Sequence, residues 1–259
     1  MDTKYLNTPR IGIYLLPGMK IIPTSYVKWI ECAGGHVVPL SATISEAEIK
    51  KQFVSLHGLL FIGGHQSITP SAFSLFCQAL ESNKQGRYFP VWGICLGFQW
   101  ILEMIGNMKL DHVLDAVDYA LPLEFTEYGK NCSRIFSDAP LSLMKILSTE
   151  KVTYNHHRDG VSLTKFCQNR RLTNFFNIVS TNKDRKDKCF ISMFEGKHFP
   201  IYGSQWHPEK NAYQFSTAPT RQNVPHNCHA RLVSYYIADF FVKECRKSLC
   251  GKFDSILKS

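Results

Sequence analysis

The sequence predicts an α/β fold in which a mostly parallel central sheet is flanked by helices and extended by antiparallel hairpins. Two observations indicate this class: the first half of the chain alternates short apolar runs with amphipathic stretches, and the second half contains apolar runs at closer spacing. The 259 residues show no internal repeat, low-complexity linker or break in composition. We therefore expect one domain over residues 1–259, long enough to bury a sizeable core.

Four apolar runs in the first half predict strands of the parallel part of the sheet, since strands buried on both faces are apolar almost throughout. They are Ile11–Leu16, Val37–Leu40, Gly58–Ile62 and Phe89–Gly93. Helices are expected between these strands, at Ser25–Ala33, from Ser45 onward, and at Ser71–Ser82. The spacing of Ser45 and Glu48 is that of a capping box, which marks the start of a helix.

The second half is less regular. Four shorter runs predict strands of partly antiparallel hairpins, at Ala120–Phe125, Phe176–Thr181, Phe190–Glu195 and Pro200–Gln205. The charge run Lys183–Lys188 mixes both signs and favours a solvated hairpin tip. The chain is expected to close with a long helix at Ala230–Lys247.

The most specific local feature is a cysteine between two glycines after the apolar run Phe89–Gly93. The segment Gly93-Ile94-Cys95-Leu96-Gly97 is typical of a sharp turn from strand to helix, where side chains at the glycine positions would clash. We expect the Cys95 sulfur to project into solvent at the helix N-terminus, whose unpaired amides favour the nucleophilic thiolate. A small buried thiol after a core strand is the alternative.

A second segment supplies a base for this nucleophile. The apolar run Pro200–Gln205 is followed by His207-Pro208-Glu209. Proline fixes its own backbone and pushes His207 toward an extended conformation. We expect Glu209 to hold the imidazole so that its other nitrogen can take the thiol proton, as in a catalytic triad.

With these two segments the chain resembles class I glutamine amidotransferase-type hydrolases, in which Gly-x-Cys-x-Gly supplies the nucleophile and a downstream His-x-Glu completes the triad. Within that superfamily it resembles the gamma-glutamyl hydrolases, which act on folate poly-gamma-glutamates. The resemblance extends over nearly the whole chain, through Ser25–Trp29, Tyr88–Gly93, Tyr202–Gly203, Gln205–Lys210 and Ala238–Val242. It implies a flavodoxin-like architecture and a cysteine hydrolase that cleaves gamma-glutamyl amide bonds through a thioester.

The resemblance also implies an oxyanion hole. The run Phe61-Ile62-Gly63-Gly64 ends a predicted strand with two glycines. The Gly64 amide would join the Leu96 amide in stabilising the tetrahedral oxyanion. An ordinary turn after the strand is the alternative for these glycines.

Two further residues are candidates for binding substrate. Gln99 lies four residues after Cys95, so both are expected on one face of the helix. His157, in the segment Asn155-His156-His157, corresponds by the resemblance to an active-site histidine, whereas two adjacent histidines in a loop are more often bystanders. Glutamate is typical of gamma-glutamyl hydrolases at the place of Gln99, and glutamine is typical of glutamine-dependent amidotransferases. A glutaminase subunit that hands ammonia to a synthase is therefore the rival function, although the chain contains no synthase domain.

A net charge of +9 favours anionic partners. The sequence shows no nucleic-acid-binding signature and no apolar run long enough to span a bilayer, so neither nucleic acid nor membrane is expected as a partner. With the resemblance, the expected partner is a small polyanionic substrate, a folyl poly-gamma-glutamate. No P-loop or dinucleotide fingerprint is present, and His226-Asn227-Cys228-His229 holds its potential ligands too close together for zinc, so neither a cofactor nor a metal is expected.

The resemblance implies a lysosomal or secreted enzyme. A signal peptide is not visible in the polar segment Met1–Arg10, which leaves a cytoplasmic location open. The odd count of nine cysteines leaves at least one thiol unpaired, and Asn131-Cys132-Ser133 is a glycosylation sequon. The oligomeric state is open as well, a homodimer being one option.

Overall fold

The computed structural model describes residues 8–111 and 114–256. Eight strands of the described chain form one mixed sheet: β1 (Arg10–Tyr14), β2 (His36–Leu40), β3 (Gly58–Phe61), β4 (Val91–Ile94), β6 (Glu124–Phe125), β8 (Phe176–Lys183), β9 (Cys189–Gly196) and β10 (Ile201–Ser204). Two further strands, β5 (Ala116–Leu121) and β7 (Thr153–His157), pair antiparallel in a separate sheet. The predicted α/β class with a large, mostly parallel sheet is confirmed.

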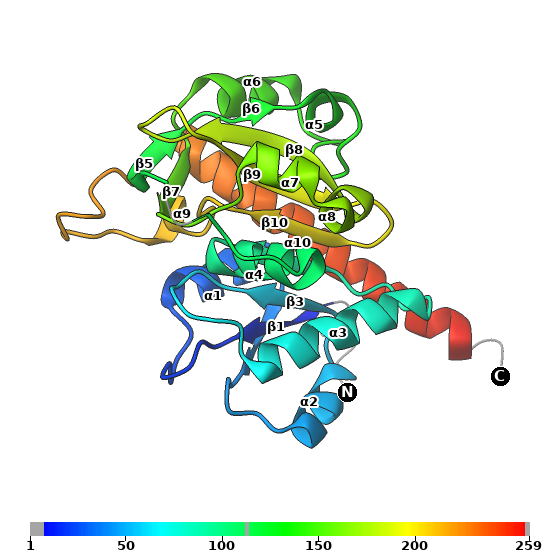
Figure 1. Cartoon of the computed structure of the whole chain (residues 1–259). Helices are drawn as coiled ribbons and strands as arrows, with labels where there is room; N and C mark the ends of the chain where they lie inside the picture. Colours follow the sequence, from blue (N-terminus) through cyan, green and yellow to red (C-terminus); the bar gives the residue numbers. More distant parts are fainter. Residues whose placement is uncertain (1–7, 112–113, 257–259) are drawn as a thin grey trace.

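The helices pack on this framework (Figure 1). They are α1 (Thr24–Glu31), α2 (Glu46–Phe53), α3 (Pro70–Lys84), α4 (Leu96–Gly106), α5 (Glu127–Asn131), α6 (Leu141–Thr149), α7 (Leu163–Gln168), α8 (Arg170–Phe175), α9 (Lys210–Tyr213) and α10 (Cys228–Ile256). The predicted start of α2 is confirmed, because the Ser45 side chain accepts a hydrogen bond from the Glu48 amide at 3.3 Å. No helix within the described ranges is long and apolar enough to cross a membrane.

The strand order brings the carboxyl ends of several parallel strands together at one edge of the large sheet. The strands lie in the order β2-β1-β3-β4-β10-β9-β8-β6 (Figure 1). Neighbours from β2 to β10 are parallel, and β9, β8 and β6 continue antiparallel. Because parallel strands end at the same edge, the carboxyl ends of β3, β4 and β10 lie side by side, where open α/β sheets bind their ligands.

Two helices, α4 and α10, hold the centre of the sheet from opposite faces. Successive side chains of a strand point to opposite faces. Trp92 of β4 packs on Phe240 and Phe241 of α10, with ring centroids 6.2 and 5.8 Å apart. The next residue, Gly93, faces the backbone of Gly97 in α4. The loop between β4 and α4 is therefore anchored on both faces.

Two predictions about the second half are wrong. The run Ala120–Phe125 is two strands in different sheets, β5 and β6, separated by Pro122, which has no amide to donate to a strand ladder. The segment Asn155-His156-His157 is not a loop but the end of strand β7. Its polar residues hide the usual apolar alternation of a strand. This segment pairs with β5, and the side chains of Asn155 and His157 form hydrogen bonds. Lys183–Lys188 does form the tip of the β8–β9 hairpin, as predicted.

A buried carboxylate ties the α5–α6 region to the sheet. Glu195 of β9 is fully buried, and its oxygens accept hydrogen bonds from Tyr128 Oη at 2.7 Å and Ser133 Oγ at 2.8 Å. The amides of Arg134 and Ile135 donate to it at 3.1 and 3.3 Å, and the Arg134 guanidinium lies 3.4 Å away. A buried charge is tolerated only when it is paired and hydrogen-bonded in this way.

Replacing this carboxylate should cost much of the stability of the fold. Glu195→Ala leaves the Arg134 guanidinium and several buried donors without their acceptor, and we expect it to lower the free energy of unfolding by about 3–5 kcal/mol. Urea denaturation followed by circular dichroism measures this. Glu127→Ala is the matched control, because Glu127 is exposed and its partners, Lys130 and Asn131, lie on the same short helix. Equal midpoints for the two variants would contradict the assignment.

Candidate active site

Cys95 lies between β4 and α4 in a backbone conformation that few residues adopt. Its φ is 53° and its ψ is −102°. A side chain at Gly97 would place a Cβ 2.2 Å from the carbonyl oxygen of Phe61, and one at Gly93 would lie 2.6 Å from the backbone of Gly97. The predicted turn is confirmed, and the glycines are required because three backbone segments meet there without room for a Cβ.

The predicted exposure and ionisation of Cys95 are wrong. The residue is only 4% exposed. Burial, followed by the charge of Glu209, raises the pKa of its thiol to about 12, although the amides of Leu96 and Gly64 donate to the sulfur and act in the opposite direction. Desolvation therefore outweighs the helix N-terminus and favours the neutral thiol over the thiolate.

His207 and Glu209 form a buried pair. His207 Nδ1 lies 2.8 Å from Glu209 Oε1, and the two side chains are 6% and 0% exposed. Burial lowers the pKa of His207 despite the carboxylate beside it, and the histidine lowers the pKa of Glu209 despite burial. With Nδ1 donating to Glu209, the other ring nitrogen, Nε2, is the one able to accept a proton.

The parallel pairing of β4 and β10 brings the distant Cys95 and His207 together. The Cys95 amide donates to the carbonyl of Ser204, the last residue of β10, at 2.9 Å. The His207 amide donates to the carbonyl of Tyr154 at 2.8 Å, which fixes the loop after β10. A Cβ built on Gly63 would lie 2.7 Å from His207 Cε1 and 3.3 Å from Cys95 Cβ. The two side chains therefore flank the same small space above the end of β3.

A cavity of about 860 Å³ opens over this space. All the residues predicted for the site from the sequence, other than Leu96 and Glu209, line it: Gly64, Cys95, Gln99, His157 and His207. Leu96 contributes its amide at the sulfur, and Glu209 lies behind His207. The fold thus gathers every predicted site residue around one cleft.

Gln99 and His157 are in the wall of the cleft, and the side-chain nitrogens of both residues have protein partners. Gln99 Nε2 donates to the Asp159 carbonyl at 2.8 Å and to Gln205 Oε1 at 3.3 Å. His157 Nδ1 lies 2.9 Å from the same Asp159 carbonyl, and its Nε2 lies 3.2 Å from Asn155 Oδ1. Burial lowers the pKa of His157 to about 3, so this ring is neutral. A direct hydrogen bond from one of these nitrogens to substrate would require exchange of these contacts.

Tyr26, Lys210 and Arg221 are among the cleft residues that were not predicted as site residues. The Tyr26 hydroxyl accepts a hydrogen bond from the Gly63 amide at 2.9 Å. Lys210 Nζ donates to Gln214 Oε1 at 2.6 Å, and burial lowers the pKa of this lysine. Tyr26 and Lys210 lie inside segments that carried the family resemblance, so a signal for them existed. Arg221, from the loop before α10, had no sequence signal.

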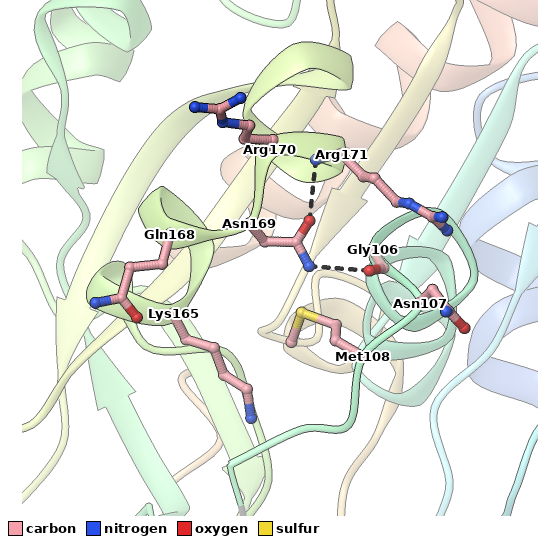
Figure 2. A pocket seen from close by; sticks show the side chains of 8 residues that line it. All are labelled: Gly106, Asn107, Met108, Lys165, Gln168, Asn169, Arg170 and Arg171. Atoms are coloured by element: carbon pink, nitrogen blue, oxygen red, sulfur yellow. Dashed lines mark hydrogen bonds between the residues drawn. The ribbon is translucent and has the colours of Figure 1, made fainter.

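A second cavity, of about 550 Å³, lies at the far end of α4 (Figure 2). Lys165, Arg170 and Arg171 are among its lining residues, and their charged ends point in different directions. Lys165 is paired with Asp111 at 2.9 Å. The lining residues include no cysteine, serine or threonine, and the one lysine among them is held by Asp111, so the chemistry is assigned to the cleft at Cys95.

Comparisons with known proteins show the family of the chain. The model of the glutamine amidotransferase class-I family matches residues 30–226. Gamma-glutamyl hydrolase of Mus musculus is 39% identical over 93% of this chain and 76% of its own length, and that of Homo sapiens is 38% identical over 89% and 73%. Gamma-glutamyl hydrolase 1 of Arabidopsis thaliana is 35% identical over 88% and 66%.

Solved structures show the same fold at low identity. A glutamine amidotransferase of Thermotoga maritima aligns with a TM-score of 0.55 and 13% identity over 92% of this chain and 98% of its own. A glutamine amido transferase of Methylobacillus flagellatus aligns with a TM-score of 0.55 and 14% identity over 93% and 95%. The flavodoxin-like, class I amidotransferase architecture implied by the sequence is confirmed.

The neutral state of Cys95 can be tested by alkylation. With a thiol pKa of about 12, the rate of labelling by iodoacetamide should rise about tenfold per pH unit between pH 6 and about 10, because only the thiolate reacts. Mass spectrometry of the Cys95 peptide measures the rate, and the exposed Cys132 in the same digest monitors the reagent. A plateau in labelling near neutral pH would instead reveal a preformed thiolate–imidazolium pair.

Proposed function

Because the chain belongs to the gamma-glutamyl hydrolase family of class-I glutamine amidotransferases, and so hydrolyses gamma-glutamyl bonds, we propose that it uses Cys95 as nucleophile and acts on folyl poly-gamma-glutamates. One observation carries the proposal. Cys95, His207 and Glu209 meet in a single cleft at the carboxyl ends of β4 and β10, with two backbone amides directed at the sulfur.

The resting site dictates how the nucleophile is activated. Since Cys95 is a neutral thiol and His207 a neutral imidazole, the proton moves from Sγ to Nε2 as the sulfur bonds to the gamma-carbonyl carbon. Glu209 stabilises the imidazolium that forms, since its carboxylate accepts the Nδ1 hydrogen. The imidazolium then gives its proton to the leaving nitrogen, and the amide bond breaks to leave a thioester.

The backbone provides the oxyanion hole in this proposal. The negative charge that develops on the carbonyl oxygen would be met by the amides of Leu96 and Gly64, which approach the sulfur from two separate loops. Water then attacks the thioester with His207 as base and releases the acid. Both half-reactions use the same groups, so no further catalytic residue is required.

Charge favours a polyanionic substrate. Three cationic side chains, Arg158, Lys210 and Arg221, line the cleft, against one carboxylate, Asp159. A poly-gamma-glutamyl tail carries a free carboxylate on each residue, and a cleft in which cations predominate raises the local concentration of an anionic ligand. The lysosomal or secreted location implied by the family stays a prediction.

The rival function, a glutaminase that donates ammonia to a synthase, was suggested by Gln99. The contacts of Gln99 with Asp159 and Gln205 support a role for its amide in holding the wall of the cleft. Its identity therefore does not by itself favour free glutamine as the substrate.

A direct comparison of two substrates tests the assignment. Incubated in parallel with a folyl poly-gamma-glutamate and with glutamine, the enzyme should release glutamate or gamma-linked glutamates from the first with the higher kcat/KM. Free glutamine offers no polyanionic tail to the cationic cleft. Chromatography of the folate products and an ammonia assay measure the two reactions. A preference for glutamine would overturn the folate assignment in favour of the glutaminase.

Loss of the nucleophile tests the mechanism. Cys95→Ser should reduce kcat by several orders of magnitude with little change in the unfolding midpoint, because a hydroxyl is a far poorer nucleophile in the same geometry. Cys77→Ser, at an exposed thiol, is the matched control and should keep the wild-type rate. A Cys95→Ser variant with a near-native rate would rule out the thioester route.

A further inference from the structure

Part of the loop between α9 and α10 lines the cleft. We call residues 214–227 the arm. In Figure 1 the arm, in orange, extends beside β5 and β7 away from the body of the molecule. Gln214, Thr220 and Arg221 of the arm line the cleft that contains Cys95 and His207. The arm is therefore part of the site, although none of its residues belongs to the proposed catalytic machinery.

One carboxylate anchors the arm to the small sheet. Asp118 of β5 accepts hydrogen bonds from the amides of Gln222 and Asn223 at 3.2 and 3.0 Å, and from Asn223 Nδ2 at 3.0 Å. Tyr154 of β7 donates its hydroxyl to the same carboxylate at 3.0 Å. Asp118 has a φ of 51° and lies where the register of the β5–β7 pair shifts. The irregularity of the strand thus directs a carboxylate at the arm.

A tight turn next to the anchor presents Arg221. The Arg221 amide donates to the Ala218 carbonyl at 3.0 Å, and Pro219 occupies the second position of this turn, where its fixed φ is favoured. The following two residues are the ones bound by Asp118. At the base of the arm the rings of Phe215 and His226 stack with centroids 4.4 Å apart. Arg221 is therefore held between two fixed points and not on a free loop.

The charge of Arg221 is available to a ligand. Within the described chain, its side chain makes no hydrogen bond or ion pair, and it is exposed at the cleft. It lies close enough to Lys210 and His207 to disfavour their protonated forms, after the larger effects of burial and Glu209. Placing the Arg221 guanidinium near these two groups costs electrostatic free energy, and a bound anion would offset that cost.

We propose that Arg221, positioned by Asp118, binds a free carboxylate of the gamma-glutamyl chain and is a specificity-determining residue of this enzyme. The proposal rests on the proposed function, because it takes the substrate to be a gamma-linked polyanion. A guanidinium matches a carboxylate with two parallel hydrogen bonds. Anchoring of the arm before substrate arrives lowers the entropy lost on binding.

The test pairs a change in the enzyme with a change in the substrate. The substrates are a folyl tri-gamma-glutamate and its analogue with carboxamides in place of the free alpha-carboxylates. Arg221→Gln should raise KM for the first about tenfold with kcat within about twofold, the size expected for one charge-assisted bond at an exposed site. The penalty on the carboxamide analogue should be under about twofold, because no carboxylate is left to lose.

Arg171→Gln is the matched control. It removes the same charge from an exposed arginine at the distant second cavity. If the net charge of the protein attracts the substrate without a specific contact, Arg171→Gln and Arg221→Gln should raise KM alike, and that result would overturn the proposal. An equal penalty for Arg221→Gln on the two substrates would overturn it as well. Wild-type turnover of the folyl substrate reports on the proposed function separately, so the two failures are distinguishable.

Asp118→Asn tests the positioning role. The change keeps the shape of the side chain but replaces one carboxylate oxygen by an NH₂ group. This group cannot accept hydrogen bonds from the amides of Gln222 and Asn223 or from Asn223 Nδ2. We expect faster hydrogen exchange at the amides of Gln222 and Asn223 and a rise in KM for the carboxylate substrate, with kcat unchanged. Combined with Arg221→Gln, it should add little to KM, since both act through one contact. A rise in KM without faster exchange, or fully additive effects, would contradict the role.

Discussion

The close approach of three backbone segments at the end of β4 is the constraint on which the site depends. The carbonyl of Phe61, the helix start at Gly97 and the strand at Gly93 leave no room for a Cβ. Only in that arrangement does Cys95 hold a positive φ while α4 begins at the next residue. The flanking sheet and α10 absorb the strain, because Trp92 is packed on the opposite face.

Burial then sets the chemistry of the site. The same packing that holds Cys95 removes it from water, and desolvation opposes both a thiolate and an imidazolium. Glu209 is the carboxylate that contacts His207 in this interior. In the proposed mechanism, charge separates only when a carbonyl is present to receive the sulfur, and the amides of Leu96 and Gly64 then stabilise the product of attack.

The rim of the cleft follows a different logic from its floor. The floor is built on the ends of parallel strands, with Cys95 and His207 buried in it, whereas the small β5–β7 sheet and the arm form the rim, which includes Arg221. Carboxylates join separate parts of the fold, a buried one at Glu195 and a half-buried one at Asp118. Glu195 joins the α5–α6 region to β9, and Asp118 joins the arm to β5. In the proposed function, the floor holds the reacting groups, and the rim selects the charged substrate.

Residue patterns predict the α/β class, most strands and helices, the elbow at Cys95 and the pairing of His207 with Glu209, because these follow from periodicity, glycine sterics and the short spacing of His-Pro-Glu. The packing of distant segments is needed to show that Cys95 is buried with a raised thiol pKa, that Asn155–His157 is in a strand, that Gln99 is bonded to the cleft wall, and that Arg221 reaches the site. Each of these depends on which distant segment packs beside the residue. A local sequence pattern predicts the backbone geometry of its own segment. The burial and the electrostatic surroundings of a side chain depend on segments distant in the sequence, which that pattern does not contain.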